Sequence, residues 1–353
     1  MELWVTDVAS PRRSARAAQE AEAAGWDGFL VVDSQNLSGD PYVALAMAAT
    51  ATSRLGLGTG VTNSVTRHAA ATATAITSVN RLSNGRAVLG IGRGDSALAH
   101  LGRGPARLKP FERYLRQLRA YLAGEAVAFE DIDIPTDVAP PMSELELADA
   151  PPFSRIDWIR GGKPVPVEVA ASGPKVIALG ALHADRVMFT LGADAERIAW
   201  GIGLARAARE AAGLDPDGVA FGAYVNAACH PDPAVARAVV RGGLTTYARF
   251  SVMHGKAAGP LASQDAEVLH TLRDSYDMRA HTRGDSRQAG TLTDGFVDRF
   301  AIAGPADHCI ARLQALAALG LDKVAISGGM RGTDPEQAAT ARRLLETEVL
   351  PAF

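Results

Sequence analysis

The sequence contains few of the features that point to a metal centre or to a nucleic-acid partner. Its 353 residues include two cysteines, Cys229 and Cys309, which lie far apart without the spacing of metal ligands. We interpret them as small buried hydrophobic residues and predict no metal site. The formal net charge of −3 gives no reason to expect nucleic acid as a partner.

Long apolar runs are also missing. No uninterrupted run reaches the roughly 18 residues of a membrane helix, and the N-terminal segment lacks an apolar core preceded by basic residues. We therefore expect a cytoplasmic enzyme without a membrane partner.

Several well-known catalytic motifs are absent as well. The sequence has no G-x-x-x-x-G-K-[ST] phosphate loop and no G-x-S-x-G nucleophile turn. Residues 90–97, GIGRGDSA, contain G-x-G but not the further glycine of a dinucleotide fingerprint. These absences disfavour a Rossmann domain, a P-loop enzyme and a serine hydrolase.

What the sequence does contain is a regular alternation of short apolar runs and longer helical patterns. About eight strand–helix units predict a single (β/α)8 TIM barrel over residues 1–353 rather than an open sheet. The expected strands are Leu3–Val8, Gly28–Asp33, Leu55–Val61, Arg86–Gly92, Val165–Ala171, Arg186–Leu191, Val219–Ala227 and Lys323–Ser327. Helical patterns are expected between them at Pro11–Ala24, Pro41–Ala51, Arg67–Leu82, Leu108–Leu122, Pro174–His183, Ala195–Ala212, Pro233–Arg249 and Pro305–Leu319, and Pro335–Val349 follows the last strand.

Two segments, 126–163 and 251–293, interrupt this alternation. Long insertions in barrels often follow strands at the carboxyl face, so we expect both to lie near the mouth of the pocket. Their candidate wall residues, which could equally pack between insertion and barrel, are Trp158, Tyr247, Phe250, Met253 and His254.

Polar residues follow several of the predicted strands. Asp33 ends the second strand and is followed by Ser34, Gln35 and Asn36; a Thr62–His68 cluster follows the third, and Asp95 follows the fourth. Because active sites of barrels lie at the carboxyl ends of the strands, Asp33, His68 and Asp95 are candidate catalytic residues. Asp7 and His254 are weaker candidates, and helix capping is the alternative for Asp33 and His68.

Glycines alternate along two neighbouring strands, at Gly56, Gly58 and Gly60 and again at Gly90, Gly92 and Gly94. Alternate residues of a strand face the same side, so each set leaves room where side chains would otherwise lie. The pattern favours the close approach of a flat ligand; tight packing within the protein is the alternative.

A possible anion site follows the fifth strand. Ser172 and Gly173 precede Pro174 and Lys175 at a predicted helix start, where free N–H groups and an ammonium would bind a phosphate or carboxylate. An ordinary capped turn is the alternative. The segment 326–331 after the last strand is comparable but less specific.

Taken together, the segments VDSQNLSGDPYVA, LGTGVTNSVTRHAA, AVLGIGRGDSALAHLG and AASGPKVIALGALHADRV resemble the bacterial luciferase-like superfamily. They are most similar to the branch that includes methylenetetrahydromethanopterin reductase and other coenzyme F420-dependent reductases. The resemblance extends over nearly the whole chain in the right order. It implies a (β/α)8 barrel that binds a flavin or 5-deazaflavin at its carboxyl face, commonly as a homodimer.

The resemblance also implies positions for the cofactor. A non-prolyl cis peptide in a bulge behind the ring would map near Gly60-Val61, Asp95 would lie near the reactive edge, and the tail phosphate would lie at the fifth strand. The implied cofactor-binding residues are Gly58, Gly60, Val61, Thr62, Asn63, Gly92, Gly94, Asp95, Ser172, Gly173, Pro174 and Lys175.

The expected function follows from this resemblance. It is F420H2-dependent hydride transfer to an imine, iminium or activated alkene of a small organic substrate. An FMNH2-dependent, O2-using monooxygenase fed by a separate cofactor reductase is the first alternative, and a non-catalytic ligand-binding barrel is the second. Some related dehydrogenases use a histidine after the second strand; Ser34, Gln35 and Asn36 stand there in this chain, which disfavours alcohol oxidation through that histidine.

Overall fold

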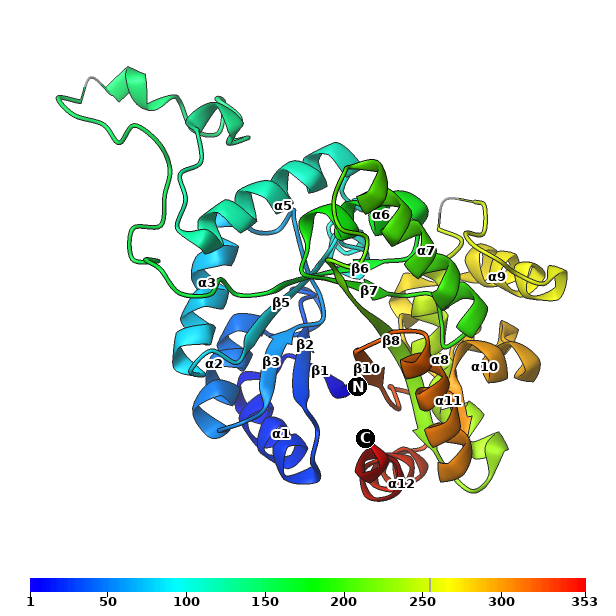
Figure 1. Cartoon of the computed structure of the whole chain (residues 1–353). Coiled ribbons are helices and arrows are strands. Elements are labelled where there is room, and N and C mark those ends of the chain that lie inside the picture. Colours follow the sequence, from blue (N-terminus) through cyan, green and yellow to red (C-terminus); the bar gives the residue numbers. More distant parts are fainter. Residues whose placement is uncertain (146, 254) are drawn as a thin grey trace.

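A closed barrel of parallel strands forms the centre of the molecule (Figure 1). The computed structural model describes residues 1–145, 147–253 and 255–353. Strand β10 pairs with both β1 and β8, which closes the ring and confirms the predicted (β/α)8 fold. The barrel strands in the described residues are β1 (Glu2–Val8), β2 (Gly28–Val32), β3 (Gly56–Thr59), β5 (Ala87–Gly92), β6 (Val167–Ala171), β7 (Arg186–Phe189), β8 (Ala220–Cys229) and β10 (Lys323–Ser327).

Helices surround this barrel, and most begin where the sequence predicts. They are α1 (Pro11–Ala24), α2 (Pro41–Ala51), α3 (Ala69–Leu82), α4 (Ser96–Ala99), α5 (Leu108–Ala123), α6 (Pro174–His183), α7 (Ala195–Ala211), α8 (Pro233–Phe250), α9 (Ser263–Ser275), α10 (Asp294–Phe300), α11 (Ala306–Ala318) and α12 (Pro335–Leu344). No helix in the described residues is long and apolar enough to cross a membrane.

The helix starts follow from local chemistry. Proline occupies the first turn of α2, α8 and α12, where its missing N–H leaves no hydrogen bond unmade. The aspartates that precede these prolines, Asp40, Asp232 and Asp334, accept hydrogen bonds from backbone N–H groups of the first turn. These three βα turns are thereby fixed, and with them the residues that follow β2, β8 and β10.

Two short strands were not predicted. β4 (Thr62–Asn63) pairs with Ile91 and Gly92 of β5, and β9 (Ile302–Gly304) pairs with the carboxyl end of β8. Strands this short contain too few residues to show an alternating pattern. β4 is nevertheless important, because it carries the chain from the end of β3 across the end of β5.

The interior of the barrel near its amino end contains a buried ionic group. Lys323 Nζ lies 2.8 and 2.9 Å from the carboxylate oxygens of Glu168 and 3.4 Å from the centre of the Trp4 ring. Arg186 donates to the same carboxylate at 2.6 Å. Because Glu168 and Lys323 are fully buried but paired, this group fills the barrel without an unpaired charge.

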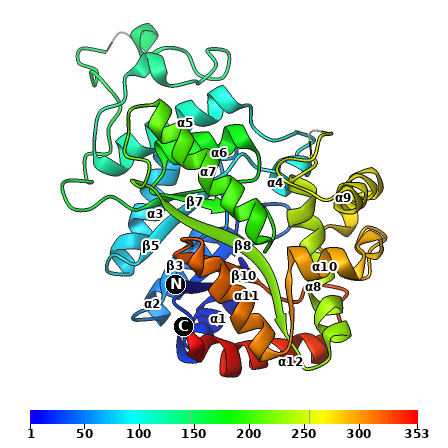
Figure 2. The same ribbon diagram turned by 45° about the vertical axis from the view of Figure 1, so that its right-hand side comes forward.

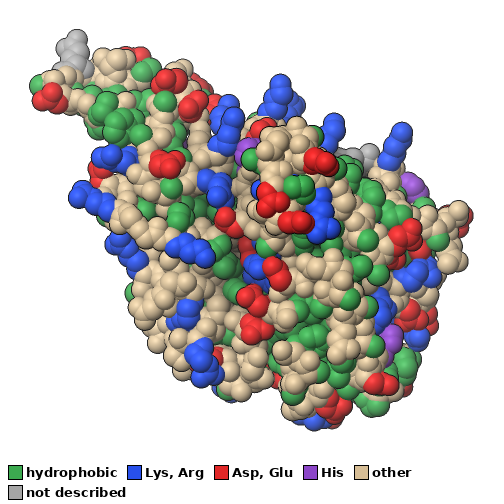
Figure 3. Space-filling view, viewed as in Figure 1, with side chains coloured by type: hydrophobic (Ala, Val, Ile, Leu, Met, Phe, Trp, Pro, Cys, Tyr) green, Lys and Arg blue, Asp and Glu red, His purple; other side chains and the backbone are tan. Residues whose placement is uncertain are grey.

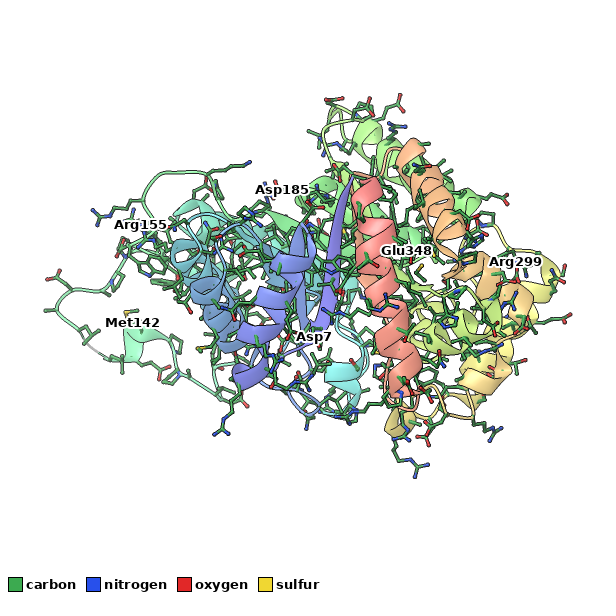
Figure 4. The ribbon with its side chains drawn as sticks, turned by 90° about the horizontal axis from the view of Figure 1, so that it is seen from below. Asp7, Met142, Arg155, Asp185, Arg299 and Glu348 are labelled. Atoms are coloured by element: carbon green, nitrogen blue, oxygen red, sulfur yellow. The ribbon has the colours of Figure 1, made fainter. Side chains whose placement is uncertain are left out.

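The first insertion does not lie where it was expected. Segment 126–163 connects the end of α5 to the start of β6, so it follows a helix and not a strand. It extends away from the barrel as an arm, on which Figure 4 labels Met142 and Arg155. Figure 3 shows hydrophobic and acidic side chains together on its surface. The expectation that this segment borders the pocket at the carboxyl face is wrong.

The second insertion, 251–293, lies beside the carboxyl ends of the strands, which we call the barrel mouth. It contains α9 and two short 3-10 turns, η3 (Met278–Ala280) and η4 (Ala289–Thr291). The insertion starts from the end of α8, which contacts the ends of three strand units. Tyr247 contacts Ser327 at the end of β10, Arg249 contacts Asp95 after β5, and Phe250 contacts Ser172 after β6. Figure 2 shows α4, α8 and α9 on the same side of the barrel.

Candidate active site

A buried carboxylate organises the ends of β2 and β4. Asp33 is 3% exposed and accepts hydrogen bonds from Thr62 Oγ1 at 2.6 Å and from Arg67 Nη1 at 2.9 Å. Arg67 also pairs with Asp40, the cap of α2. Burial alone would lower the pKa of Arg67, but Asp33 and Asp40 outweigh burial and raise it. The guanidinium thus stays charged and links the β2 loop to the turn before α3.

The loops after β2 and β5 are also in direct contact. Ser34 Oγ lies 3.1 Å from Ser96 Oγ, and Gln35 Nε2 donates to the carbonyl oxygen of Ala97 at 2.9 Å. These residues stand where the family resemblance placed a histidine in some relatives. Here their hydrogen bonds hold α4 in place.

Asn63 and Gly94 shape the backbone between these loops. Asn63 is 1% exposed, and its Oδ1 accepts from the backbone N–H groups of Val65 and Thr66, both at 3.0 Å. Gly94 has φ +80°, a conformation that favours glycine, and it packs against Asn63 and Leu98. Asn63 and Gly94 therefore each stabilise a turn, in addition to any contact that they make with a ligand.

The alternating glycines do not form a flat seat for a ligand. A Cβ atom at Gly58 would lie 2.6 Å from Val88 Cγ2, one at Gly60 would lie 2.9 Å from Leu30 Cβ, and one at Gly90 would overlap the carbonyl oxygen of Thr59. The space beside these glycines is filled by the barrel interior itself. The packing alternative is correct for them, and the flat-ligand interpretation is wrong.

An apolar surface at the mouth begins at Val61, one residue after Gly60. The peptide bond between Gly60 and Val61 is cis, which confirms the position that the resemblance implied. Val61, Ala170 and Tyr247 are half-buried and pack on the interior cluster that contains Tyr224. A Cβ atom at Gly92 would lie 3.3 Å from Val61 Cγ2. Val61 therefore covers Gly92, and its side chain presents the apolar surface.

Asp95 lies in a second polar cluster, which sequence reasoning did not foresee. It forms an ion pair with Arg249 at the end of α8, and each side chain is 15% exposed. The Arg249 guanidinium lies 4.5 Å from the centre of the Tyr276 ring, and Tyr276 Oη lies 2.8 Å from His281 Nδ1. Burial lowers the pKa of His281 to about 4, so this imidazole is neutral near pH 7.

The start of α6 is open, as an anion site requires. Gly173 is the N-cap of α6, no side chain caps the helix, and a Cβ atom at Gly173 would meet nothing within 4 Å. Pro174 occupies the first turn, and Lys175 is exposed. Ser172 Oγ donates to the carbonyl oxygen of Phe250 at 3.3 Å, which joins this turn to the end of α8.

The remaining candidates are distributed differently. His68 is largely exposed and caps α3 by accepting a hydrogen bond from the Ala70 N–H at 3.2 Å. The ring is still partly shielded from water, and this partial burial lowers its pKa. Of the expected wall residues, Tyr247 and Phe250 lie at the mouth, whereas Trp158 lies on the arm, beneath Arg81. His254 lies outside the described residues.

Other parts of the described chain do not offer a competing centre. No group of three or more His, Cys, Asp or Glu residues there could hold a metal ion. An open hollow of about 650 Å³ lies near the starts of β6, β7 and β8, at the opposite end of the barrel from the mouth. Figure 4 labels Asp7 near the carboxyl end of β1 and, above it in the view, Asp185 just before β7.

Comparison with known proteins now decides the family. The sequence model described as luciferase-like monooxygenase matches residues 3–323. The chain belongs to this luciferase-like family. This luciferase-like chain is 28% identical over 329 residues to 5,10-methylenetetrahydromethanopterin reductase of Methanolobus tindarius, and the match covers 92% of each chain. The chain is thus an oxidoreductase.

Solved structures agree on the fold. The coenzyme F420 dependent tetrahydromethanopterin reductase from Methanopyrus kandleri superimposes with a TM-score of 0.73 at 20% identity, covering 100% of this chain and 99% of the other. The monooxygenase RslO1 from Streptomyces bottropensis gives a TM-score of 0.65 at 20% identity, covering 99% of both chains. The barrel fold is common to all three.

Proposed function

We propose that this protein is an F420H2-dependent reductase that transfers a hydride to a C=N or activated C=C bond of a small organic substrate. The observation that carries the proposal is the similarity over 92% of both chains to a methylenetetrahydromethanopterin reductase. The solved relative from Methanopyrus kandleri is named as dependent on coenzyme F420. The bound cofactor would supply the hydride.

The mouth has features that fit such a cofactor. The uncapped start of α6, with the open space at Gly173 and the ammonium of Lys175, suits the phosphate of the cofactor tail. The half-buried surface of Val61, Ala170 and Tyr247 suits a flat ring. We propose that Ser172, Gly173, Pro174 and Lys175 hold the tail and that Val61, with Gly60, Thr62 and Asn63 beside it, supports the ring.

The polar residues would position and shield the reacting groups. Asp33, held by Thr62 and Arg67, fixes the backbone that carries Val61. At the other side of the mouth Asp95 is ion-paired with Arg249, and we propose that this pair is the electrostatic partner of the reacting groups. His68 is assigned to helix capping, because its ring nitrogen is already used there.

A second candidate function is an FMNH2-dependent monooxygenase supplied by a separate reductase. The family description names monooxygenases, and RslO1 has the same fold. In this case the same mouth would hold FMN, and the reduced ring would react with O2.

Titration of the purified protein with F420 and with FMN separates the two functions. For the reductase we expect F420 to bind more tightly, and F420H2 to be oxidised anaerobically when a cyclic imine or an enone is added. Tight binding of reduced FMN, together with substrate-dependent O2 uptake, would contradict the reductase and support the monooxygenase.

We further propose a homodimer formed through α2 and α3. Neither Pro41–Ala51 nor Ala69–Asn80 contains a charged residue, although Val43 and Met47 on α2 are 51% and 46% exposed. A helix that is apolar all round is normally buried. A second copy of the chain would cover this uncharged surface.

A further inference from the structure

Four side chains contact one another at one side of the barrel mouth, and His100 lies near enough to help lower the pKa of His281. We call the five the Arg249 cluster: Asp95, His100, Arg249, Tyr276 and His281. They come from the β5 loop, the end of α8 and the second insertion. Arg249 pairs with Asp95, lies 4.5 Å from the Tyr276 ring centre and 5.9 Å from that of Phe250. The guanidinium is therefore held between a carboxylate and two aromatic rings.

The cluster has hydrogen-bonding groups to spare. Arg249 Nε and His100 Nε2 are buried and have no hydrogen-bond partner in the described part of the chain. Arg249 Nε–H can only donate, and an unpaired buried donor costs about 1 to 3 kcal/mol, so it points to a ligand that supplies an acceptor atom. His100 Nε2 donates or accepts according to its tautomer. The rings of Tyr276 and Phe250 suit a flat, conjugated ligand beside the guanidinium.

The charge of the cluster discriminates between substrate classes. Hydride addition to an iminium removes a positive charge, whereas hydride addition to an alkene conjugated with a carbonyl places a negative charge on the carbonyl oxygen. A fixed guanidinium stabilises the second transition state and disfavours an iminium beside it. Asp95 and Arg249 neutralise each other, so what the pair still offers a ligand is the unpaired Nε–H donor of Arg249, which suits an oxygen that gains negative charge and not a cation.

We propose that Arg249 binds the carbonyl oxygen of an α,β-unsaturated carbonyl substrate and stabilises the negative charge that forms there. This inference rests on the proposed reductase function and selects the activated alkene among its substrates. The β carbon receives a hydride from the reduced deazaflavin, the C=C electron pair shifts to form the enolate, and water protonates the α carbon. The substrate gains two electrons, and the cofactor loses them. Asp95 and Tyr276 position the guanidinium.

A binding experiment without cofactor tests the oxyanion site directly. The probe is 4-nitrophenol, whose ionised form absorbs visible light and resembles an enolate oxygen on a flat ring. We expect the wild-type chain to bind the ionised form at least tenfold more tightly than Arg249→Met does, with Arg249→Lys between them. Arg237→Met is the matched control, because it removes an ion pair with Asp298 from the same helix. Equal affinity of wild type and Arg249→Met would overturn the proposal.

A second experiment measures turnover with F420H2. We expect the wild type to reduce 2-cyclohexen-1-one, and Arg249→Met to lower kcat by about 100-fold or more, as loss of one oxyanion donor does. Arg237→Met should stay within about twofold of the wild type. Circular dichroism checks that each variant is folded. If Arg249→Met does not fold, the comparison of wild type with Arg249→Lys tests the same prediction.

The outcomes separate this inference from the function on which it rests. If the wild type reduces the cyclic imine 1-pyrroline but not the enone, or if Arg249→Met keeps its enone rate, the inference fails while the reductase stands. If F420 does not bind and F420H2 is not oxidised with either probe, the reductase fails, and this inference fails with it.

Discussion

At the scale of single residues, the same amino acid serves opposite purposes within β5 and in the turn that follows the neighbouring strand β6. Gly90 is enclosed by the carbonyl oxygen of Thr59, whereas Gly173 faces open space at the start of α6. The sequence shows a glycine in both places but not what lies beside it, because that depends on which strands become neighbours. The flat-ligand interpretation of the alternating glycines failed for this reason.

This contrast yields a paired prediction. Gly90→Ala should lower the free energy of unfolding by about 2 kcal/mol or more, because the new Cβ meets backbone that cannot move aside. Gly173→Ala should change it by less than about 0.5 kcal/mol, yet weaken F420 binding if the cofactor tail lies there. Urea unfolding and F420 titration measure the two effects. A Gly90→Ala protein as stable as the wild type would contradict the packing argument.

His281 gives the protein a predictable loss of stability in acid. Burial lowers its pKa from 6.5 to about 4, so the unfolded chain binds more protons than the folded chain between these values. Stability is therefore complete above pH 6.5 and decreases as the pH falls toward 4, by about 2 kcal/mol at pH 5. Urea unfolding at pH 7.5 and pH 5 should show a smaller difference for His281→Asn. The control is His270→Asn, an exposed histidine on α9, which should behave as the wild type.

The candidate site was predictable from sequence only in part. Asp33, Asp95 and Ser172 each follow a predicted strand, and parallel strands of a barrel place such residues at one face. Arg249 could not be paired with Asp95 in advance, because they are separated by 154 positions and nothing local to either indicates the other. The position of α8 in the folded barrel determines that Arg249 is the partner of Asp95, and no sequence motif indicates it.

At the scale of elements, the order of helix and insertion decides which end of the barrel an insertion occupies. Segment 126–163 follows the predicted helix Leu108–Leu122 directly, and a segment that joins a helix to the next strand belongs to the amino end. That signal was present in the sequence. Segment 251–293 also follows a helix, but the end of α8 crosses the mouth, so the insertion starts there.

The second insertion depends on one buried arginine. Arg197 in α7 is 1% exposed and donates to the carbonyl oxygens of Leu191 and Pro260 at 2.9 and 3.1 Å and to Ser251 Oγ at 2.9 Å. Burial lowers its pKa to about 10, so it remains charged at neutral pH. It joins α7 to the start of the segment that carries Tyr276 and His281.

Replacing Arg197 should therefore loosen the insertion before it unfolds the barrel. We expect Arg197→Met to lower the free energy of unfolding by about 2 to 4 kcal/mol and to show faster amide exchange over residues 255–262. Arg197→Lys should not restore the three hydrogen bonds of the guanidinium, because an ammonium lacks its planar geometry. Arg206→Met, which removes an exposed ion pair from the same helix, is the control and should change little. Unchanged exchange over the insertion in Arg197→Met would show that other contacts hold it.

At the scale of the whole molecule, the proposed dimer can be tested on its uncharged surface. A carboxylate buried in this uncharged surface would be unpaired, so Val43→Glu should convert the dimer to a monomer. Leu214, which is 43% exposed after α7, provides a matched control, Leu214→Glu, that should remain a dimer. Light scattering after size exclusion gives the masses. A wild-type monomer, or a Val43→Glu dimer, would rule out this interface.

The pairing of β1 with β10 has a consequence for synthesis. Glu2 lies in register with Lys323, so the two edges of the sheet that close the barrel are separated by almost the whole chain. At roughly 5 to 20 residues per second, the ribosome needs on the order of half a minute between these two segments. During that time β1 exposes an edge with no strand beside it, and chaperones that shield such edges should govern the yield of folded protein in cells.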